Sequence, residues 1–249
     1  MQARNLPTVD TRYWVALLIA SVLGTTFGDF VSEDLGFTFA GAAIPLAATF
    51  GIILLAERSS LVRTVAWYWV AVVIFRSMAT TLGDTLSRTL HLGYGSTSLV
   101  LGILLLALVI AVARRSTGAS VSNDGSRKVL RVNSKYWGAL LIASLFGTTF
   151  GDYVADDLGL GFDVASIVLV GALALGVLWD QRAGSASDAR YWALVAMVRT
   201  AGTTLGDFFS EGAPHLGFGL AAICAGTALL FIVFGPALLV RREPVPESD

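Results

Sequence analysis

The sequence predicts an all-α fold: a polytopic membrane bundle of about eight transmembrane helices, organised as four two-helix repeats. Three observations lead to this prediction. The 249 residues are 55% hydrophobic and only 14% charged, against about a quarter charged in ordinary soluble proteins. One short frame recurs four times along the chain, and most Lys and Arg residues lie outside these frames. A soluble fold of this length cannot bury so much apolar surface, so we expect lipid to be part of its solvent.

Composition also excludes several classes of function. The formal net charge of −1 provides no positive field for phosphates, so we expect no nucleic-acid partner. The single cysteine, Cys224, rules out an internal disulfide framework and a cysteine metal cluster, and we interpret it as a small core residue. No nucleotide-binding loop, nucleophile–base pair or haem ligand set is visible, and two histidines leave little room for a zinc enzyme. We therefore expect neither an enzyme nor a resident cofactor.

Each repeat opens with a Tyr-Trp pair and reaches an aspartate 15 residues after the tryptophan, at the end of a Thr-Thr-x-Gly-Asp element. A Leu-Gly pair follows each aspartate within about a dozen residues. The tryptophans are Trp14, Trp69, Trp137 and Trp192. The aspartates are Asp29, Asp84, Asp152 and Asp207.

Two kinds of repeat alternate, because successive tryptophans are 55, 68 and 55 residues apart. The even repeats alone carry an arginine eight residues before the aspartate, Arg76 and Arg199. The chain is thus a duplication, and we expect pseudo-twofold symmetry between its halves. The first half is 1–118, a polar cytoplasmic linker is 119–135, and the second half, with a short cytoplasmic tail, is 136–249.

Each repeat contains two apolar runs of about 20 residues, the length that a spanning helix requires. The first run begins at Tyr-Trp and ends at the aspartate, and the second begins near Leu-Gly. Pro45 and Pro236 fall within second runs and predict kinks there. The expected helices are roughly 13–30, 37–56, 66–84, 94–113, 136–153, 162–179, 190–207 and 217–240.

Basic residues predict the orientation. Fourteen of the 17 Lys and Arg residues lie at the termini or between repeats, whereas the loops within repeats hold only Arg88. The positive-inside rule then places both termini of a multi-pass membrane protein in the cytoplasm. The first apolar run carries the repeat motif, so we do not interpret it as a signal peptide.

This orientation puts an acidic set of side chains on the outer face, either as a cation-concentrating vestibule or as solvated loops. The set is Glu33, Asp34, Asp156, Asp157 and Glu211. His91 and His215 occupy matching outer loops, where we favour solvation over metal capture. The Tyr-Trp pairs lie at the opposite membrane surface, where we predict an aromatic belt, with substrate stacking as the alternative.

The repeated Thr-Thr-x-Gly-Asp element is the main candidate site. Thr25 and Asp29 are four residues apart, and Thr26 and Asp29 three apart, so hydroxyls and carboxylate share one helix face. Carboxylate and hydroxyl oxygens suit Mg²⁺, Mn²⁺, Ca²⁺ or Na⁺, so the four aspartates are candidate ligands of a bound cation of unspecified identity. The candidate hydroxyls are Thr25, Thr26, Thr80, Thr81, Thr148, Thr149, Thr203 and Thr204.

Arg76 and Arg199 lie deeper in the membrane, where an arginine costs at least about 2.5–3.5 kcal/mol and should face the bundle interior. Against four ionised aspartates, the two arginines leave two negative charges uncompensated. One divalent cation or two protons would neutralise them. A packing role is the alternative, because Gly24 and Gly28 form Gly-x-x-x-Gly, which lets membrane helices approach closely. The two interpretations are compatible.

Four tandem units, each with two spans and a tryptophan, resemble a bacterial family of integral membrane proteins catalogued as a repeat of unknown function. The resemblance covers Tyr13 to about Val240 and rests on the four tryptophans and the Thr-Thr-x-Gly-Asp elements. It implies a bacterial cytoplasmic membrane and transfers no activity.

The residues favour a secondary transporter of a cation, either a divalent metal ion or a proton-coupled substrate. Two alternatives stay open. One is a transporter of a small anion or polar metabolite clamped by Arg76 and Arg199. The other is a non-transporting sensor or scaffold. The expected partners are the lipid bilayer and a small ion or molecule, and the sequence leaves homo-oligomerisation open.

Overall fold

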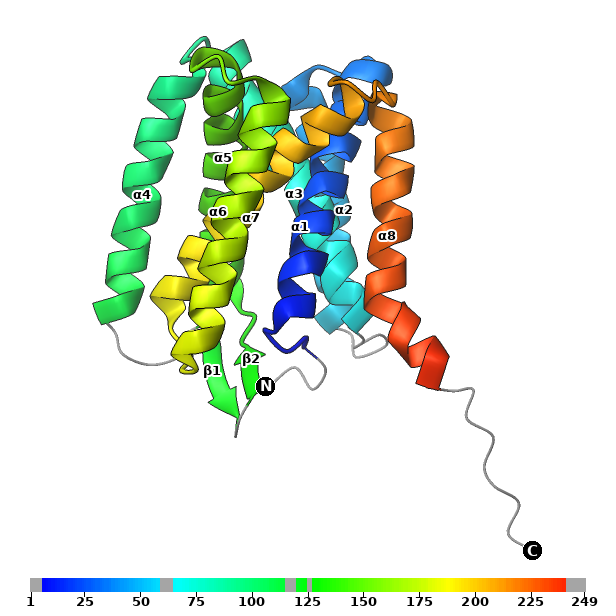
Figure 1. Cartoon of the computed structure of the whole chain (residues 1–249). Helices are drawn as coiled ribbons and strands as arrows, with labels where there is room; N and C mark the ends of the chain where they lie inside the picture. The colour runs from blue at the N-terminus through cyan, green and yellow to red at the C-terminus, as the bar shows by residue number, and fades with distance from the viewer. Residues whose placement is uncertain (1–5, 59–64, 115–119, 125–126, 241–249) are drawn as a thin grey trace, which may run out of the picture.

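The computed structural model describes residues 6–58, 65–114, 120–124 and 127–240, and this part of the chain is almost entirely helical. Eight long helices form four pairs, as the repeats predict (Figure 1). Asp10, Asn133 and Ser187 accept a hydrogen bond from the first turn of α1, α5 and α7 respectively, which fixes where these helices begin. The helices are α1 (Thr11–Asp29), α2 (Phe39–Arg58), α3 (Val65–Asp84), α4 (Tyr94–Arg114), α5 (Ser134–Asp152), α6 (Gly161–Ala183), α7 (Asp188–Ser210) and α8 (Gly217–Val240).

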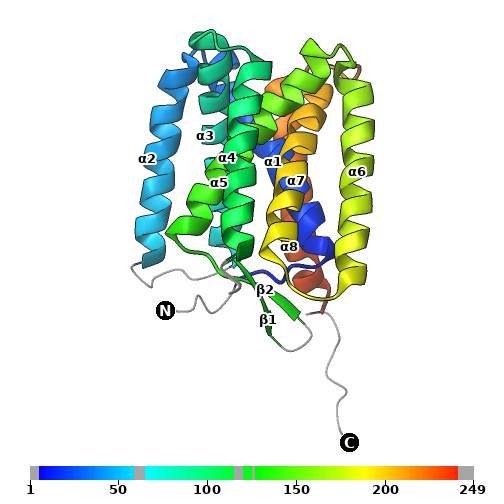
Figure 2. The ribbon, with the colours of Figure 1, turned by 90° about the vertical axis from the view of Figure 1, so that its left-hand side faces the viewer.

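The four odd-numbered helices form a closed inner ring in the order α1, α3, α5, α7. The four even-numbered helices lie outside this ring (Figures 1 and 2). Each outer helix packs on the inner helix of the next repeat: α2 on α3, α4 on α5, α6 on α7, and α8 back on α1. The two halves of the duplication therefore interlock within one bundle.

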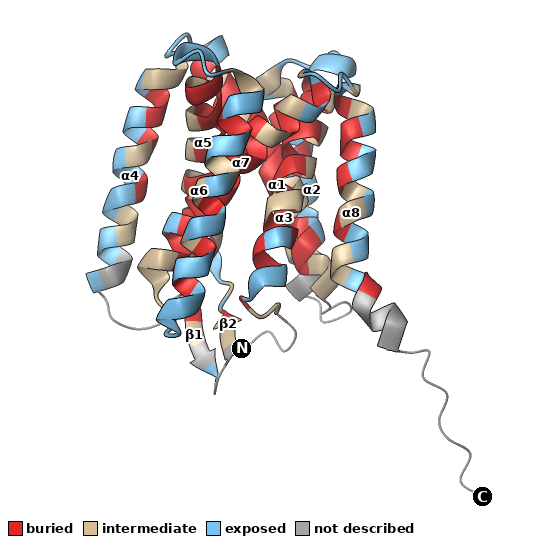
Figure 3. Ribbon diagram, in the orientation of Figure 1, coloured by how far each residue is buried: buried red, intermediate tan, exposed pale blue. Residues whose placement is uncertain are grey.

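Seven of the eight helices in the described chain are long and apolar enough to cross a membrane, and the chain is a multi-pass membrane protein. Only 22% of each outer span is buried, against 61–67% of the inner spans α1, α3 and α5 (Figure 3). Of the eight long helices in the described chain, α7 is the one that is not apolar enough to qualify as a span. It packs against α1, α5 and α6. A helix surrounded by protein does not need the apolar surface that contact with lipid requires.

Glycines of the repeated element hold the inner helices close together, so the predicted packing role is confirmed. An ideal Cβ at Gly24 would lie 2.3 Å from Cγ of Arg76. One at Gly147 would lie 2.7 Å from the backbone carbon of Arg199. Such approaches are possible only where no side chain stands between the helices.

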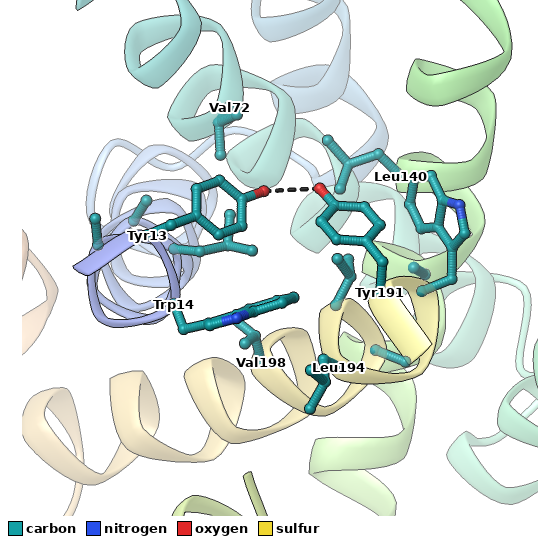
Figure 4. Close-up of a cluster of buried hydrophobic side chains, with 14 of the residues drawn as sticks. Tyr13, Trp14, Val72, Leu140, Tyr191, Leu194 and Val198 are labelled. Atoms are coloured by element: carbon teal, nitrogen blue, oxygen red, sulfur yellow. Dashed lines mark hydrogen bonds between the residues drawn. The ribbon is translucent and has the colours of Figure 1, made fainter. Parts of the chain in front are cut away.

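The aromatic-belt prediction for the Tyr-Trp pairs is wrong, because three of the four pairs are wholly buried and Trp137 is half-buried. The hydroxyl of Tyr13 lies 2.7 Å from that of Tyr191 (Figure 4). It lies 3.0 Å from the hydroxyl of Tyr68. Tyr136 completes the circle, 2.8 Å from Tyr68 and 3.0 Å from Tyr191. Mutual hydrogen bonding lets the four phenols sit inside the ring of helices instead of at the headgroups. We call this layer the tyrosine ring.

The linker predicted between the halves contains an antiparallel hairpin, β1 (Val121–Asp124) and β2 (Arg127–Leu130), at the bundle end where α1 begins. Val121 and Leu130 are buried in the main core. Lys128 on β2 forms an ion pair of 2.8 Å with Asp180. Trp192 donates its indole N–H to Ser120 Oγ at 3.1 Å. The segment is thus a docked cap, although its composition is that of a polar linker.

The outer helix α8 carries Cys224 and Pro236, and the structure tests the prediction for Cys224. Cys224 is exposed on this outer helix, which corrects its interpretation as a core residue. Pro236 removes the N–H that would reach the carbonyl of Ile232, four residues earlier. Arg12 donates to that carbonyl at 2.7 Å and to the carbonyl of Val233 at 2.6 Å. The proline therefore leaves the carbonyl of Ile232 without its helical donor, and an arginine from α1 donates to it instead.

Candidate functional site

Positions four residues apart on each inner helix lead from the tyrosine ring to the opposite end of the bundle. Each helix contributes one residue to each of six layers. Beyond the tyrosine ring lie Leu17, Val72, Leu140 and Val195, all buried. The third layer is Ser21, Arg76, Ser144 and Arg199. The fourth layer is Thr25, Thr80, Thr148 and Thr203. The fifth layer is Asp29, Asp84, Asp152 and Asp207. The sixth layer is Glu33, Arg88, Asp156 and Glu211.

The last three layers line one cavity of about 140 Å³, to which Phe162 also contributes. The structure thus brings all four repeated aspartates together, as predicted. Their residues are between 4% and 7% exposed, so they do not cap loops in water. Seven carboxyl groups line this cavity, which we call the aspartate cavity.

Four predicted threonines and two predicted acids lie outside the lining of the aspartate cavity. The second threonine of each pair returns its hydroxyl to a carbonyl of its own helix, as Thr26 does to Val22 at 3.1 Å. The others are Thr81, Thr149 and Thr204. Asp34 and Asp157 are exposed and one residue beyond the lining positions.

Three short π-helices carry the mouth of the aspartate cavity: η1 (Phe30–Asp34), η2 (Thr85–Thr89) and η3 (Tyr153–Asp157). Each follows the aspartate of its repeat directly and widens the last turn of the inner helix. In the fourth repeat α7 continues instead to Ser210, and Glu211 caps it. Partial burial and the nearby carboxylates of Glu33 and Asp156 raise the pKa of Glu211, despite the opposing charge of Arg88.

Arg88 lines the aspartate cavity and is a candidate site residue that the sequence prediction overlooked. It stands four residues after Asp84, the position that acidic residues hold in the other repeats. Its guanidinium lies 3.6 Å from the carboxylate of Asp84 and 3.5 Å from that of Glu33. It also donates to the hydroxyl of Tyr94. The sequence feature that could have revealed it is that Arg88 is the one basic residue in the loops within repeats.

Arg76 closes the floor of the aspartate cavity. It is fully buried and reaches across the ring from α3 to all three other inner helices. Its Nη2 donates to Thr25 Oγ1 at 2.9 Å, to Thr203 Oγ1 at 2.5 Å and to the carbonyl of Arg199 at 3.4 Å. Its Nη1 donates to Thr148 Oγ1 at 2.6 Å and to the carbonyl of Ser144 at 3.0 Å. We call this set of five acceptors the guanidinium slot.

A repeat family matches the chain over residues 12–60, 67–117, 135–184 and 190–243, under the description Repeat of Unknown Function (DUF347). These four ranges coincide with the four helix pairs that build the site. The chain belongs to the DUF347 family. No curated protein and no solved structure matches it.

In this DUF347 chain the predicted metal site needs a correction. Among the described residues, no group of three or more His, Cys, Asp or Glu side chains is arranged to hold a metal ion. The four aspartates come from helices on four sides of the cavity, so they surround a space instead of converging on one point. Direct coordination of one ion by all four carboxylates is therefore not built into this arrangement.

The two histidines of the DUF347 chain lie outside the site. His91 and His215 are exposed in equivalent loops and do not line the aspartate cavity. Both adopt left-handed backbone conformations, with φ of 54° and 46°. Their position supports the interpretation as solvated loop residues.

Proposed function

We propose that the protein is a secondary transporter of a cation, which enters through the aspartate cavity. A single observation carries the proposal: four aspartates and four threonines from four repeats line one cavity inside a helix ring. Sites at the interface between repeats are the usual place for cargo in transporters built from internal repeats. We infer transport and not catalysis, because the cavity offers carboxylates and hydroxyls without a paired nucleophile and base.

Charge favours a cation over other cargo. Among the described residues, seven carboxyl groups and one basic side chain, Arg88, line the aspartate cavity, and Arg76 lies beneath it. The four aspartates among these groups are buried, and buried carboxylates are costly unless cations or protons neutralise them. The unpartnered hydroxyl of Thr80, a residue 2% exposed, is an additional acceptor for cargo in this cavity.

Size and geometry favour a cation that keeps water molecules, or a small organic cation. A volume of about 140 Å³ corresponds to roughly four or five waters at about 30 Å³ each. The carboxylates surround this volume without forming a metal-ligating group. Mg²⁺ binds readily in this way because it gives up its hydration water reluctantly.

We propose that the aspartate cavity faces the outside of the cell. α1 begins and α8 ends at the end of the bundle opposite the cavity. The distribution of Lys and Arg supports a cytoplasmic position for that end. Beneath the guanidinium slot, the Leu17, Val72, Leu140 and Val195 layer and the tyrosine ring separate the cavity from the cytoplasmic end. The described arrangement is then the outward-open state of alternating access.

The alternative of an anion clamp receives less support. Neither Arg76 nor Arg199 is among the lining residues of the aspartate cavity. Arg76 also donates from Nη1 and Nη2 to all five acceptors of the guanidinium slot. A sensor or scaffold would bind a cation without moving it. Uptake measurements separate that case from a transporter.

Isothermal titration of the detergent-purified protein tests the proposal. The series contains Na⁺, Mg²⁺, Mn²⁺, Ca²⁺, Zn²⁺ and guanidinium, with chloride and small carboxylates as the anion arm. We expect saturable binding of at least one cation, and affinity that falls as the pH is lowered, because protonation removes the attracting charge. For Glu211 this loss begins above the usual range of a glutamate, since its pKa is raised. Binding of anions alone would contradict the proposal.

Replacement of Arg88 should strengthen cation binding. Arg88→Gln removes the positive charge that now neutralises Asp84 and Glu33, and we expect the dissociation constant to fall at least about 3-fold. Arg182→Gln is the matched control, because it removes one exposed positive charge near the C-terminus of α6, at the other end of the bundle. Titration of both variants with the same cation is the measurement. Equal affinities for the two variants would show that Arg88 does not compete with the cargo.

A further inference from the structure

The two halves of the chain are related by a constant shift of 123 residues, yet their buried arginines are used differently. This shift turns Arg76 into Arg199, Thr80 into Thr203 and Thr25 into Thr148. Arg76 fills the guanidinium slot. Arg199 is equally buried, but its Nε, Nη1 and Nη2 have no hydrogen-bond partner among the residues that the structure describes.

A second pair of equivalent residues differs in the same sense. The hydroxyl of Thr203 accepts from Arg76 and donates to the carbonyls of Gly147, at 3.2 Å, and Arg199, at 3.0 Å. The hydroxyl of Thr80 has no partner in the described structure. The threonine that serves Arg76, Thr203, is therefore fully hydrogen-bonded, whereas the equivalent threonine for Arg199, Thr80, has a free hydroxyl among the described residues.

We propose that the guanidinium slot is a shared site, which Arg199 occupies when Arg76 leaves. The shift of 123 residues defines the second arrangement. Arg199 would donate to Thr25, Thr148 and Thr80 and to the carbonyls of Ser21 and Arg76. Thr25 and Thr148 exchange places under the shift, so they serve both arginines, whereas Thr203 serves Arg76 and Thr80 serves Arg199.

Energetics supports exchange between two arrangements. A fully buried guanidinium without hydrogen bonds raises the free energy of the folded state, so occupation of the guanidinium slot would stabilise Arg199. Its gain equals what Arg76 loses, since the two acceptor sets are equivalent in composition. Two arrangements of nearly equal energy are the basis of a two-state element.

The exchange changes which helix is tied across the bundle. Arg76 connects α3 to α1, α5 and α7, whereas Arg199 would connect α7 to α1, α5 and α3. A guanidinium remains below the aspartate cavity in both arrangements. The exchange does not require the aspartates to bind a cation, so its test is independent of the proposed function.

A double-mutant design tests the exchange through thermal unfolding of the detergent-purified protein. Thr203→Val should lower the melting temperature of the wild type by about 3–12 °C, because Arg76 loses an acceptor. Thr80→Val should leave it unchanged, because the Thr80 hydroxyl has no partner. Arg76→Met should allow Arg199 to occupy the guanidinium slot, so the effects of the two threonine substitutions on the melting temperature should be exchanged. In that background Thr80→Val should lower the melting temperature and Thr203→Val should not.

Two controls complete the test. Thr203→Ser keeps the hydroxyl and should restore the wild-type melting temperature. Arg199→Met removes a charge that has no hydrogen-bond partner among the described residues and should leave the protein folded. In that background Thr203→Val should still lower the melting temperature. The proposal is overturned if Thr80→Val has no effect in the Arg76→Met background. It is also overturned if Arg76→Met and Arg76→Lys both fail to fold while Arg199→Met folds, since Arg199 then cannot replace Arg76.

Discussion

Simultaneous replacement of Asp29, Asp84, Asp152 and Asp207 with asparagine should abolish cation uptake into proteoliposomes and weaken binding at least about 100-fold. Such a loss corresponds to about 2.8 kcal/mol of binding free energy. Asparagine keeps the size of each side chain and removes its charge, so the aspartate cavity retains its shape while its attraction for cations falls. Titration calorimetry and uptake of the same cation provide the two measurements.

The control for this variant is the pair Asp34→Asn and Asp157→Asn. Both residues are exposed, belong to the same π-helical turns as the mouth and lie outside the lining of the aspartate cavity. We expect this variant to bind and transport like the wild type. Unchanged uptake in the quadruple variant would refute the cation transporter, and equal losses in both variants would show that only the overall surface charge matters.

Alanine at Gly147 should cause the largest loss of stability of any single methyl group on the inner ring. An ideal Cβ there lies 2.7 Å from the backbone carbon of Arg199 and 2.8 Å from the backbone nitrogen of Thr200. Backbone atoms cannot rotate away, so α5 and α7 must separate. We expect a decrease of about 1–3 kcal/mol in the free energy of unfolding, the usual cost of overpacking.

Gly171→Ala on the outer helix α6 provides the matched comparison, because nothing lies within 4 Å of its ideal Cβ. Alanine suits a helix interior better than glycine, so this variant should gain up to about 1 kcal/mol. Denaturant unfolding of both variants in one detergent measures the difference. A stable Gly147→Ala protein would mean that α5 and α7 do not approach as closely as described.

Repeat spacing predicted the architecture well because it reports local geometry. The interval between tryptophan and aspartate places each helix end within a few residues, as α3 (Val65–Asp84) shows against the predicted 66–84. The same interval puts Asp29 and its three equivalents at one depth, which is why their convergence could be predicted. The four ranges that match the DUF347 family each coincide with two long helices of the described chain, in agreement with this prediction.

Contacts between repeats could not be predicted in this way. Thr25 and Thr26 are both within helical reach of Asp29, and only the neighbouring helices decide that Thr25 lines the aspartate cavity. The tyrosines have the composition of an interfacial belt, but four of them meet inside the ring and satisfy one another. Hydropathy indicates how much apolar surface a segment has, without indicating which polar groups find partners.

Hydropathy and helical periodicity therefore determine the number of helices, their limits and the position of each charged side chain along its helix, because both depend only on the local sequence. Which side chains contact one another is determined by the packing of the closed ring. The packing of α2 on α3, the pairing of Arg88 with Asp84 and Glu33, and the different surroundings of Arg76 and Arg199 all arise where repeats meet. Two arginines with identical positions in the repeat have different environments: Arg76 donates to the guanidinium slot, whereas the guanidinium of Arg199 has no hydrogen-bond partner among the described residues.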